Sequence, residues 1–217
     1  MKSTGLGHST RWLLLLALLV LAAGCGEEPR YAPLPPGSVV LAFGDSVTWG
    51  TGANRGEDFP SLLAARSGWQ VVNAGVPGDT AAAARERIGG LLQQHNPALV
   101  IVELGGNDFL RKRADNQVAA DLREILQAVQ EHGAIPVLVA VPRVSLLRAS
   151  VGALQDAPLY ARLAEEHGIL LVADVFSGVL SQASLRADSI HPNRQGYEVF
   201  ADGLAAALRE AGLLPQA

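Results

Sequence analysis

The chain has 217 residues, of which 17 are Lys or Arg and 21 are Asp or Glu, so its formal net charge at pH 7 is −4. This acidic balance, with no cluster of basic residues, argues against a nucleic-acid partner and against electrostatic docking on anionic lipid. A single cysteine excludes a disulfide within the chain and a metal site built from several cysteines.

The N-terminus carries an export signal. Two basic residues, Lys2 and Arg11, precede a continuous apolar run from Trp12 to Ala23. A run of about 12 residues is too short to cross a bilayer, which needs about 20 apolar residues. The pattern therefore predicts a cleaved signal peptide over residues 1–24 rather than a permanent membrane span.

The end of this run, Leu-Ala-Ala-Gly-Cys over residues 21–25, resembles a bacterial lipobox, although its Leu lies one residue further from the Cys than is usual. The resemblance implies that Cys25 is lipidated and becomes the mature N-terminus. It implies an exported bacterial lipoprotein, anchored in the membrane on the periplasmic side of the cell envelope. An ordinary secretory peptide with an incidental cysteine is the alternative.

Residues 25–37 contain four prolines and no helical or strand pattern, which is typical of a semi-rigid tether of about 3 Å per residue. Residues 38–217 are long enough for one domain with a sizeable core, and they show no internal repeat. Loss of residues 1–24 removes Lys2 and Arg11 but no acid, so the mature charge is 15 − 21 = −6.

Short apolar runs alternate with longer amphipathic segments in this domain. The runs predict five strands, buried on both faces, at Val39–Phe43, Gln70–Asn73, Ala98–Glu103, Ile135–Val141 and Ile169–Ala173. The other segments predict helices at Phe59–Ser67, Thr80–His95, Asn116–His132, Gln155–His167 and Arg194–Ala211. Gly133 and Gly168 are expected to end two of them, and Asp79 or Thr80 to cap the second. Alternating strands and helices predict a three-layer α/β/α sandwich with a five-stranded parallel sheet.

Four short motifs follow four of these strands. They are Gly44-Asp45-Ser46, Gly75-Val76-Pro77-Gly78-Asp79, Gly105-Gly106-Asn107-Asp108 and Asp188-Ser189-Ile190-His191-Pro192. In an open parallel sheet, ligands bind outside the carboxyl ends of the strands, and all four motifs fall at that edge. Unrelated turn residues would fall as readily at the opposite edge.

Ser46, His191 and Asp188 are candidates for a nucleophile, its base and the carboxylate that orients the base. A spacing of three residues allows Asp188 to reach Nδ1 of His191 while Nε2 faces the serine. Because position 48 is Thr, the segment is not the Gly-x-Ser-x-Gly elbow of α/β-hydrolases. The alternatives are an N-capping serine and an ordinary polar loop before the last helix.

Elimination also favours His191 among the five histidines. His95, His132 and His167 stand at predicted helix C-termini, where a partly positive imidazole is favourable, so we expect them to be structural. His8 leaves with the signal peptide. His191 is then the one mature histidine in a context that suggests chemistry.

Gly78 and Asn107 are candidates for donors to an oxyanion. A glycine at a helix start can present an unhindered backbone N–H, and the Asn107 amide can donate to the same atom. Either residue can instead be a plain turn former. We expect Asp45 and Asp108 to fix loops through backbone hydrogen bonds rather than to act on substrate.

With these motifs in order, the domain resembles the SGNH, or GDSL-type, hydrolases, and the matching residues are Ser46, Gly78, Asn107 and His191, with Asp188 as the acid. The segments 71–80, 102–108 and 191–193 are similar to the bacterial thioesterase, arylesterase and lysophospholipase branch, which tends to carry Gly where this chain has Ser189. The resemblance implies the flavodoxin-like SGNH fold and hydrolysis of aryl or alkyl esters, acyl thioesters or lysophospholipids through an acyl-enzyme. It implies an oxyanion hole of Ser46, Gly78 and Asn107 and no metal or cofactor.

Substrate identity stays open. Apolar residues between Ser145 and Asp156 can wall an acyl pocket or pack on the domain. A carbohydrate O-deacetylase of cell-envelope glycans is the second hypothesis, and a non-catalytic, ligand-binding lipoprotein is the third. A flavodoxin-like FMN binder is the remaining alternative at the level of the fold. We expect a monomer.

Overall fold

The computed structural model describes residues 30–143 and 154–215. The predicted signal peptide and Cys25 lie outside these ranges. From Tyr31 onward the described residues belong to one compact unit. None of the helices among them is long and apolar enough to cross a membrane.

The centre of the fold is a five-stranded, wholly parallel sheet with the strand order β2-β1-β3-β4-β5. Its strands are β1 (Val39–Gly44), β2 (Gln70–Gly75), β3 (Leu99–Glu103), β4 (Ile135–Val139) and β5 (Leu170–Val172). Gly44 at the end of β1 pairs with Gly75 of β2 and with Glu103 of β3. The three strands that precede the first three motifs therefore end at the same level.

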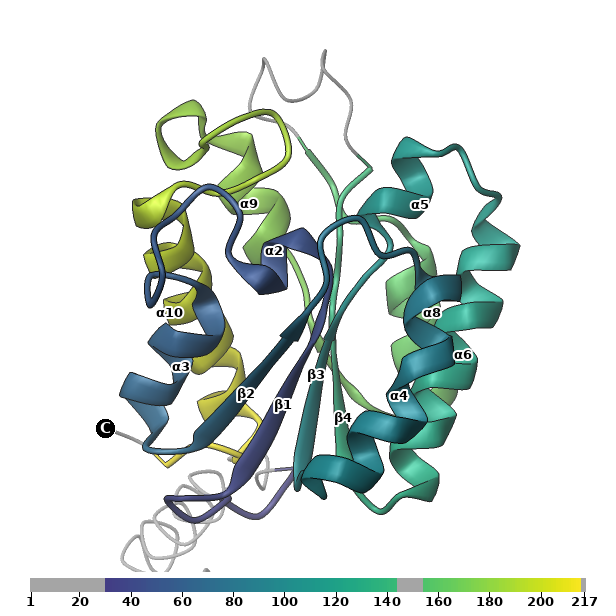
Figure 1. Ribbon diagram of the computed structural model, residues 1–217, viewed down its shortest axis with the longest axis vertical. Coiled ribbons are helices and arrows are strands. Elements are labelled where there is room, and N and C mark those ends of the chain that lie inside the picture. Colours follow the sequence, from purple (N-terminus) through teal and green to yellow (C-terminus); the bar gives the residue numbers. More distant parts are fainter. Residues whose placement is uncertain (1–29, 144–153, 216–217) are drawn as a thin grey trace, which may run out of the picture. The chain divides into compact units, whose positions relative to one another are not determined.

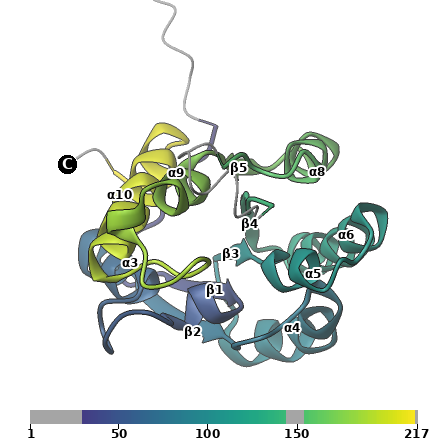
Figure 2. The ribbon, with the colours of Figure 1, turned by 90° about the horizontal axis from the view of Figure 1, so that it is seen from above.

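Helices cover both faces of the sheet, which confirms the predicted three-layer sandwich (Figures 1 and 2). One layer contains α3 (Phe59–Ser67), α9 (Val175–Ser181) and α10 (Arg194–Glu210), and the other contains α4 (Ala81–His95), α6 (Asp115–Glu131) and α8 (Leu159–His167). Two short helices, α2 (Ser46–Trp49) and α5 (Gly106–Leu110), directly follow β1 and β3, and a 3-10 turn, η1 (Ala183–Leu185), precedes the fourth motif.

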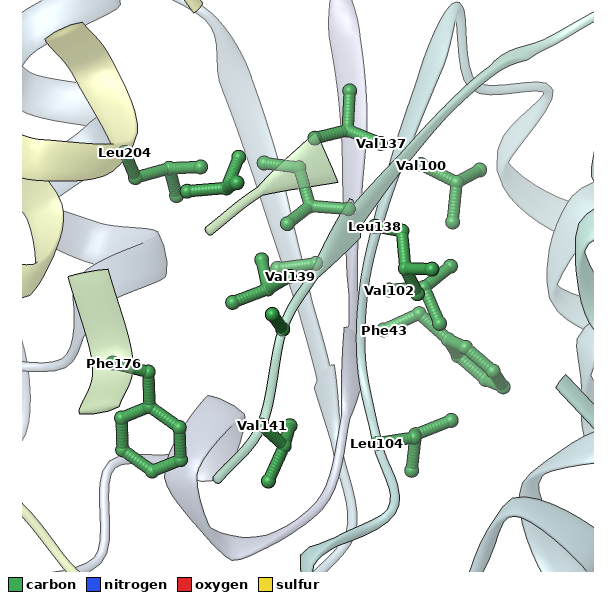
Figure 3. Packing of buried hydrophobic residues seen from close by; sticks show 14 of the residues in the cluster. Phe43, Val100, Val102, Leu104, Val137, Leu138, Val139, Val141, Phe176 and Leu204 are labelled. Carbon is green, nitrogen blue, oxygen red and sulfur yellow. The ribbon is translucent and has the colours of Figure 1, made fainter. Parts of the chain in front are cut away.

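Alternating side chains of the central strands build the core on both sides of the sheet. Figure 3 shows Val139 and Val141 on the side of Phe176 and Leu204, while Val102 and its neighbours point to the other side. Every residue of β3 is buried, whereas β2, an edge strand, keeps several exposed or half-buried positions. The expectation of strands covered on both faces thus holds for the middle of the sheet and only in part for its edge.

Local signals placed several helix ends correctly. Thr80 caps α4, because its Oγ1 accepts a hydrogen bond of 3.2 Å from the backbone N of Ala83. Gly168 ends α8 in the left-handed conformation with φ of 61°, and Gly133 adopts a similar φ of 87° just after α6. His95, His132 and His167 all lie at helix C-termini, as expected.

Other boundaries differ from the sequence expectation. The helix expected from Gln155 begins at Leu159, because Asp156 is held in a bridge with Pro142 and Pro158 occupies the cap position. The short helices α2, α5 and α9 were not predicted. Each has at most seven residues, which is too short for a periodic apolar pattern to show.

The compact unit also begins before the predicted boundary at Ser38. Backbone N atoms of Tyr31 and Leu34 donate to the carbonyls of Ala211 and Leu213 over 3.0 and 2.9 Å, and both side chains pack against the core. The predicted tether of residues 25–37 is therefore attached to the domain from Tyr31 onward. The segment from Tyr31 thus lies against the residues that directly follow α10.

Candidate active site

Ser46 is the first residue of α2 and lies two positions beyond the end of β1. The turn is tight, since a Cβ on Gly44 would lie 2.0 Å from Thr48 Oγ1 and one on Gly75 would lie 2.2 Å from the backbone N of Trp49. Only glycine fits at these two motif positions. The cap of α2 is Asp45 rather than Ser46, so the serine hydroxyl is left for another partner.

That partner is His191, which the fold brings to Ser46 from 145 positions further along the chain. The Oγ of Ser46 lies 2.9 Å from Nε2 of His191, and Nδ1 of His191 lies 2.7 Å from Oδ2 of Asp188. In the tautomer whose Nδ1–H donates to Asp188, Nε2 is unprotonated and can accept a proton from the serine. The structure thus brings together the predicted nucleophile, base and carboxylate in one hydrogen-bonded chain.

Asp188 is held in its orientation by its own loop. Its Oδ1 accepts hydrogen bonds of 2.8 Å from the backbone N of Ile190 and of His191. Burial opposes the charged form of this carboxyl, but the hydrogen bonds from His191 and Ile190 outweigh it and lower the pKa of Asp188. Asp188 is therefore a stable anion beside the imidazole, and such an anion can stabilise a protonated His191.

The loop from Ala187 to Asn193 is closed at both ends. The backbone N of Ala187 donates to the carbonyl of His191 over 2.9 Å, and the backbone N of Asn193 donates to the carbonyl of Leu185 over 2.9 Å. Asn193 also caps α10 through the backbone N of Gly196. The His191 side chain is only 13% exposed, more enclosed than its loop position suggests, while that of Asp188 is 53% exposed.

The predicted oxyanion donors lie at the same edge. Gly78 has φ of 85°, a left-handed conformation that favours glycine, and an added Cβ there would meet no atom within 4 Å. Within the described ranges, the backbone N atoms of Ser46 and Gly78 donate to no protein acceptor. The side-chain amide of Asn107, at the start of α5, donates to Asp45 and to the carbonyl of Asp79.

Buried polar side chains next to Ser46, Gly78 and Asn107 hold the backbone of the site loops in place. Asp45 is 3% exposed and its Oδ1 accepts from the backbone N of Val47 over 3.0 Å, as expected for a residue that fixes a loop. Asp108 does the same for the backbone N of Ala81 over 2.9 Å. Burial raises the pKa of Asp45 to about 6, although the hydrogen bonds from Val47 and Asn107 oppose that shift.

Glu103 was missed by sequence reasoning, which placed it in a strand and gave it no role. It is 1% exposed at the end of β3 and accepts hydrogen bonds from Thr48 Oγ1, at 2.9 Å, and from the backbone N of Asp45. Burial, together with the charge of Asp45, raises the pKa of Glu103. The available signal was a lone acid at the end of an apolar strand, two residues before Gly105.

Arg87 was also missed. From α4 its guanidinium donates to Asp79 Oδ2 at 2.7 Å and to the carbonyls of Gly44 and Ala74 at 2.9 Å each, and it lies over the ring of Phe43. One side chain thus ties the loop of Gly78 to the ends of β1 and β2. Sequence reasoning included Arg87 in the predicted helix Thr80–His95 and gave it no role.

A pocket of about 30 Å³ opens beside Ser46 and His191. Its remaining wall is largely apolar and includes Leu110, Val141, Pro142, Phe176, Leu180 and Ile190. The predicted pocket segment from Ser145 falls mostly outside the described residues. Its end, Leu154, is buried in the core with its backbone N 3.1 Å from Ser181 Oγ. Within the described ranges, 30–143 and 154–215, no group of three or more His, Cys, Asp or Glu residues is placed so that it could hold a metal ion.

A parallel α/β/α sandwich with a serine, histidine and aspartate chain at its carboxyl edge defines the class of serine hydrolases outside the Gly-x-Ser-x-Gly group. The chain belongs to the GDSL-like lipase/acylhydrolase family, whose profile matches residues 42–199. It is therefore an ester-hydrolysing enzyme, as the resemblance in the sequence implies.

Curated relatives agree with this assignment. The chain is 33% identical over 210 residues to thioesterase 1/protease 1/lysophospholipase L1 of Escherichia coli K12, covering 92% of this chain and 93% of the relative. It is 30% identical to esterase TesA of Pseudomonas aeruginosa, covering 80% of this chain and 89% of the relative. The crystal structure of TesA matches with a TM-score of 0.70 and 27% identity, covering 80% of this chain and 99% of that one. These likenesses do not favour a glycan deacetylase, an FMN binder or a non-catalytic protein.

Proposed function

We propose that this esterase works by two-step acyl transfer with Ser46 as nucleophile, His191 as general base and acid, and Asp188 as the carboxylate that orients His191. The observation that carries the proposal is the continuous chain from Ser46 Oγ to Nε2 at 2.9 Å and from Nδ1 to Asp188 at 2.7 Å. His191 takes the serine proton as Oγ attacks the ester or thioester carbonyl. It then gives that proton to the leaving alcohol or thiol, and finally activates the water that releases the acid.

The oxyanion of each tetrahedral intermediate is bound by the backbone N–H of Ser46, the backbone N–H of Gly78 and the side-chain amide of Asn107. The two backbone donors have no competing acceptor within the described residues, so they are free to meet a ligand. Donors fixed before the reaction stabilise the developing charge without a cost of reorganisation.

For the substrate we propose carboxylic esters and thioesters, among them aryl and alkyl esters and lysophospholipids. The apolar wall around Phe176 and Leu180 suits the acyl group, while the polar edge of Ser46 and His191 faces the carbonyl. The printed names of the relatives include thioesterase, lysophospholipase and esterase. No cofactor enters the reaction.

Hydrolysis of p-nitrophenyl esters from acetate to palmitate by the purified full-length chain in non-ionic detergent tests this function. Ser46→Ala is the matched variant, since it removes one oxygen from a half-buried position. Turnover by the wild type and loss of turnover in Ser46→Ala support the proposal, and the chain-length profile gives the acyl preference. Equal turnover by both proteins overturns the role of Ser46. Absence of turnover by a folded wild type overturns the proposal that the enzyme is a broad esterase.

We further propose that residues 1–24 are removed, that Cys25 is lipidated, and that a monomeric enzyme faces the periplasm from its membrane anchor. Six residues, Cys25 to Arg30, lie between the proposed anchor and the compact unit, which begins at Tyr31. Labelling with a radioactive fatty acid in cells is expected for the wild type and absent for Cys25→Ser. Equal labelling of both proteins would contradict the anchor.

A further inference from the structure

Both hydrogens of the Asn107 side-chain amide are bound by acceptors of the protein itself. Its Nδ2 lies 2.9 Å from Oδ2 of Asp45 and 3.0 Å from the main-chain carbonyl oxygen of Asp79. An amide nitrogen carries two hydrogens, and both neighbours are acceptors, which fixes the orientation of the amide. For Asn107 to donate to an oxyanion, one of these two hydrogen bonds has to open.

The two acceptors differ in strength and in rigidity. Asp45 is a carboxylate, 3% exposed, and its other oxygen is already bound by the backbone N of Val47. Asp79 offers a neutral peptide carbonyl next to Gly78, whose Cα faces open space. Hydrogen bonds to a charged acceptor are roughly twice as strong as neutral ones. The bond to Asp79 is therefore the one that opens.

We propose that Asp45 is the positioning residue of the oxyanion hole: its carboxylate holds one hydrogen of Asn107 throughout the reaction, so that the other passes from the Asp79 carbonyl to the oxyanion. The inference rests on the proposed place of Asn107 in that hole. It assigns Asp45 a task beyond capping α2, because the same carboxylate sets the rotation of the Asn107 amide.

The exchange of the Asp79 carbonyl for the oxyanion as acceptor of the Asn107 hydrogen favours the transition state over the bound substrate. A neutral ester carbonyl is no better an acceptor than the carbonyl of Asp79, so the ground state gains nothing from displacing it. An oxyanion is a charged acceptor and does displace it. Asn107 then contributes to kcat and little to substrate binding.

The surroundings of Asp45 keep its carboxylate available at neutral pH. The titratable groups that face it are Glu103 on β3, Asp79 after β2, and His191, with Tyr160 and Tyr197 further away. Burial raises the pKa of Asp45 to about 6, which still leaves it ionised in an assay at pH 7.5. Glu103 accepts a hydrogen bond from the backbone N of Asp45, which fixes the main chain of Asp45 as well as its side chain.

Asp45→Ser separates the two tasks of this residue. A serine at the same position still caps α2 through the backbone N of Val47, but its side chain is too short to reach Asn107. We expect kcat for p-nitrophenyl acetate to fall by about 10- to 100-fold, with KM changed by less than about threefold. Asp45→Asn, which keeps the size but turns a donor toward Asn107 or Val47, serves as a second variant if Asp45→Ser does not fold.

The deciding measurement is a double-mutant cycle with Asn107→Ala. If Asp45 acts through Asn107, Asp45→Ser lowers kcat by no more than about threefold once Asn107 is already Ala. An equal loss in both backgrounds overturns the proposal and leaves Asp45 a structural residue. If Asn107→Ala alone leaves kcat unchanged, the proposed oxyanion hole is what fails, and this inference falls with it.

Asp58→Ser is the matched control. Asp58 is also a buried aspartate, 6% exposed, that caps a helix, since its Oδ1 accepts from the backbone N of Ser61 at the start of α3. It makes no contact with Asn107. Its replacement is expected to lower stability and to leave kcat within about twofold of the wild type. A loss of kcat equal to that of Asp45→Ser would mean that any buried cap has this effect, which overturns the positioning role.

Discussion

The two halves of the active site are built in opposite ways. The half that contains Ser46, Gly78 and Asn107 rests on two buried acids, Asp45 and Glu103, and on the half-buried Arg87, which connect it to the ends of β1, β2 and β3. The half that contains Asp188 and His191 is a surface loop held almost entirely by its own hydrogen bonds, with the Asp188 side chain 53% exposed.

This difference indicates which changes affect catalysis alone and which also affect folding. In the loop half, a side chain can be removed while the sheet stays intact, because its contacts are local. In the nucleophile half, the groups that hold the site also bind backbone atoms at the strand ends, such as the carbonyls of Gly44 and Ala74. Changes there leave a buried polar group unpaired, which costs stability as well.

The largest effect on activity is expected from His191→Ala. Loss of the base should lower kcat by about 10⁴- to 10⁶-fold, while the free energy of unfolding falls by only about 1 kcal/mol, because the loop keeps its backbone hydrogen bonds. Ester hydrolysis and urea unfolding measure the two quantities. His132→Ala, a change at a helix C-terminus where Nε2 meets Asn96, is the control and should stay fully active. Unfolding of His191→Ala at ordinary temperature would contradict the separation of the two halves.

Asn107→Ala should come next. Removing one oxyanion donor lowers kcat by about 10²- to 10³-fold with KM nearly unchanged. Because its amide also binds Asp45 and Asp79, a moderate loss of stability is expected as well. Steady-state kinetics over a range of substrate concentrations separates the two constants. A rise in KM with an unchanged kcat would show that Asn107 binds the substrate rather than the transition state.

Arg87→Ala tests the link between activity and folding in the nucleophile half. The change removes the guanidinium hydrogen bonds to the carbonyls of Gly44 and Ala74, of which Gly44 keeps its bond from the backbone N of Val76, and it removes the ion pair with Asp79. We expect a loss of about 2 to 4 kcal/mol in stability and about 10-fold in kcat. Arg85→Ala, two positions earlier on α4 and paired with acids away from the site, should change stability little and leave kcat unchanged. Equal effects of the two changes would argue against a special role for Arg87.

The last effect leaves activity aside and concerns the pH dependence of stability. The pKa of Asp45 is raised from 3.8 to about 6 in the folded protein, mainly by burial, so folding favours its protonated form. The stability that this group contributes is fully present below pH 3.8 and is lost as pH rises through 6. The destabilisation caused by Asp45→Ser should therefore shrink by up to about 3 kcal/mol between pH 4 and pH 7.5.

Chemical unfolding of the wild type and Asp45→Ser at both pH values measures this change. Asp188 should show the opposite sign, because its pKa is lowered and its contribution is lost as pH falls. A destabilisation by Asp45→Ser that is independent of pH would mean that Asp45 titrates normally. The buried half and the exposed half would then no longer differ in their electrostatics.

Sequence reasoning recovered the sheet because each strand is a continuous apolar run, such as that of β3, and such runs are readable locally. It also placed the four motifs at one edge, because the carboxyl ends of parallel strands share that edge by geometry. It missed α2, α5 and α9, whose lengths of four, five and seven residues are too short for periodicity. It expected a free segment up to Gly37, although Tyr31 and Leu34 dock on the end of the domain.

For the site, the sequence by itself determined which chemical groups are present. It also determined that each group follows the carboxyl end of a strand. Glycine at 44 and 75, a serine at 46 and an aspartate three residues before His191 are local facts of the sequence. Only the tertiary structure decided that Glu103 and Arg87 support the site, and that Asn107 shares its two hydrogens between Asp45 and Asp79. Those contacts join residues far apart in the chain, and their distances are set by the packing of helices on the sheet, which no local pattern encodes.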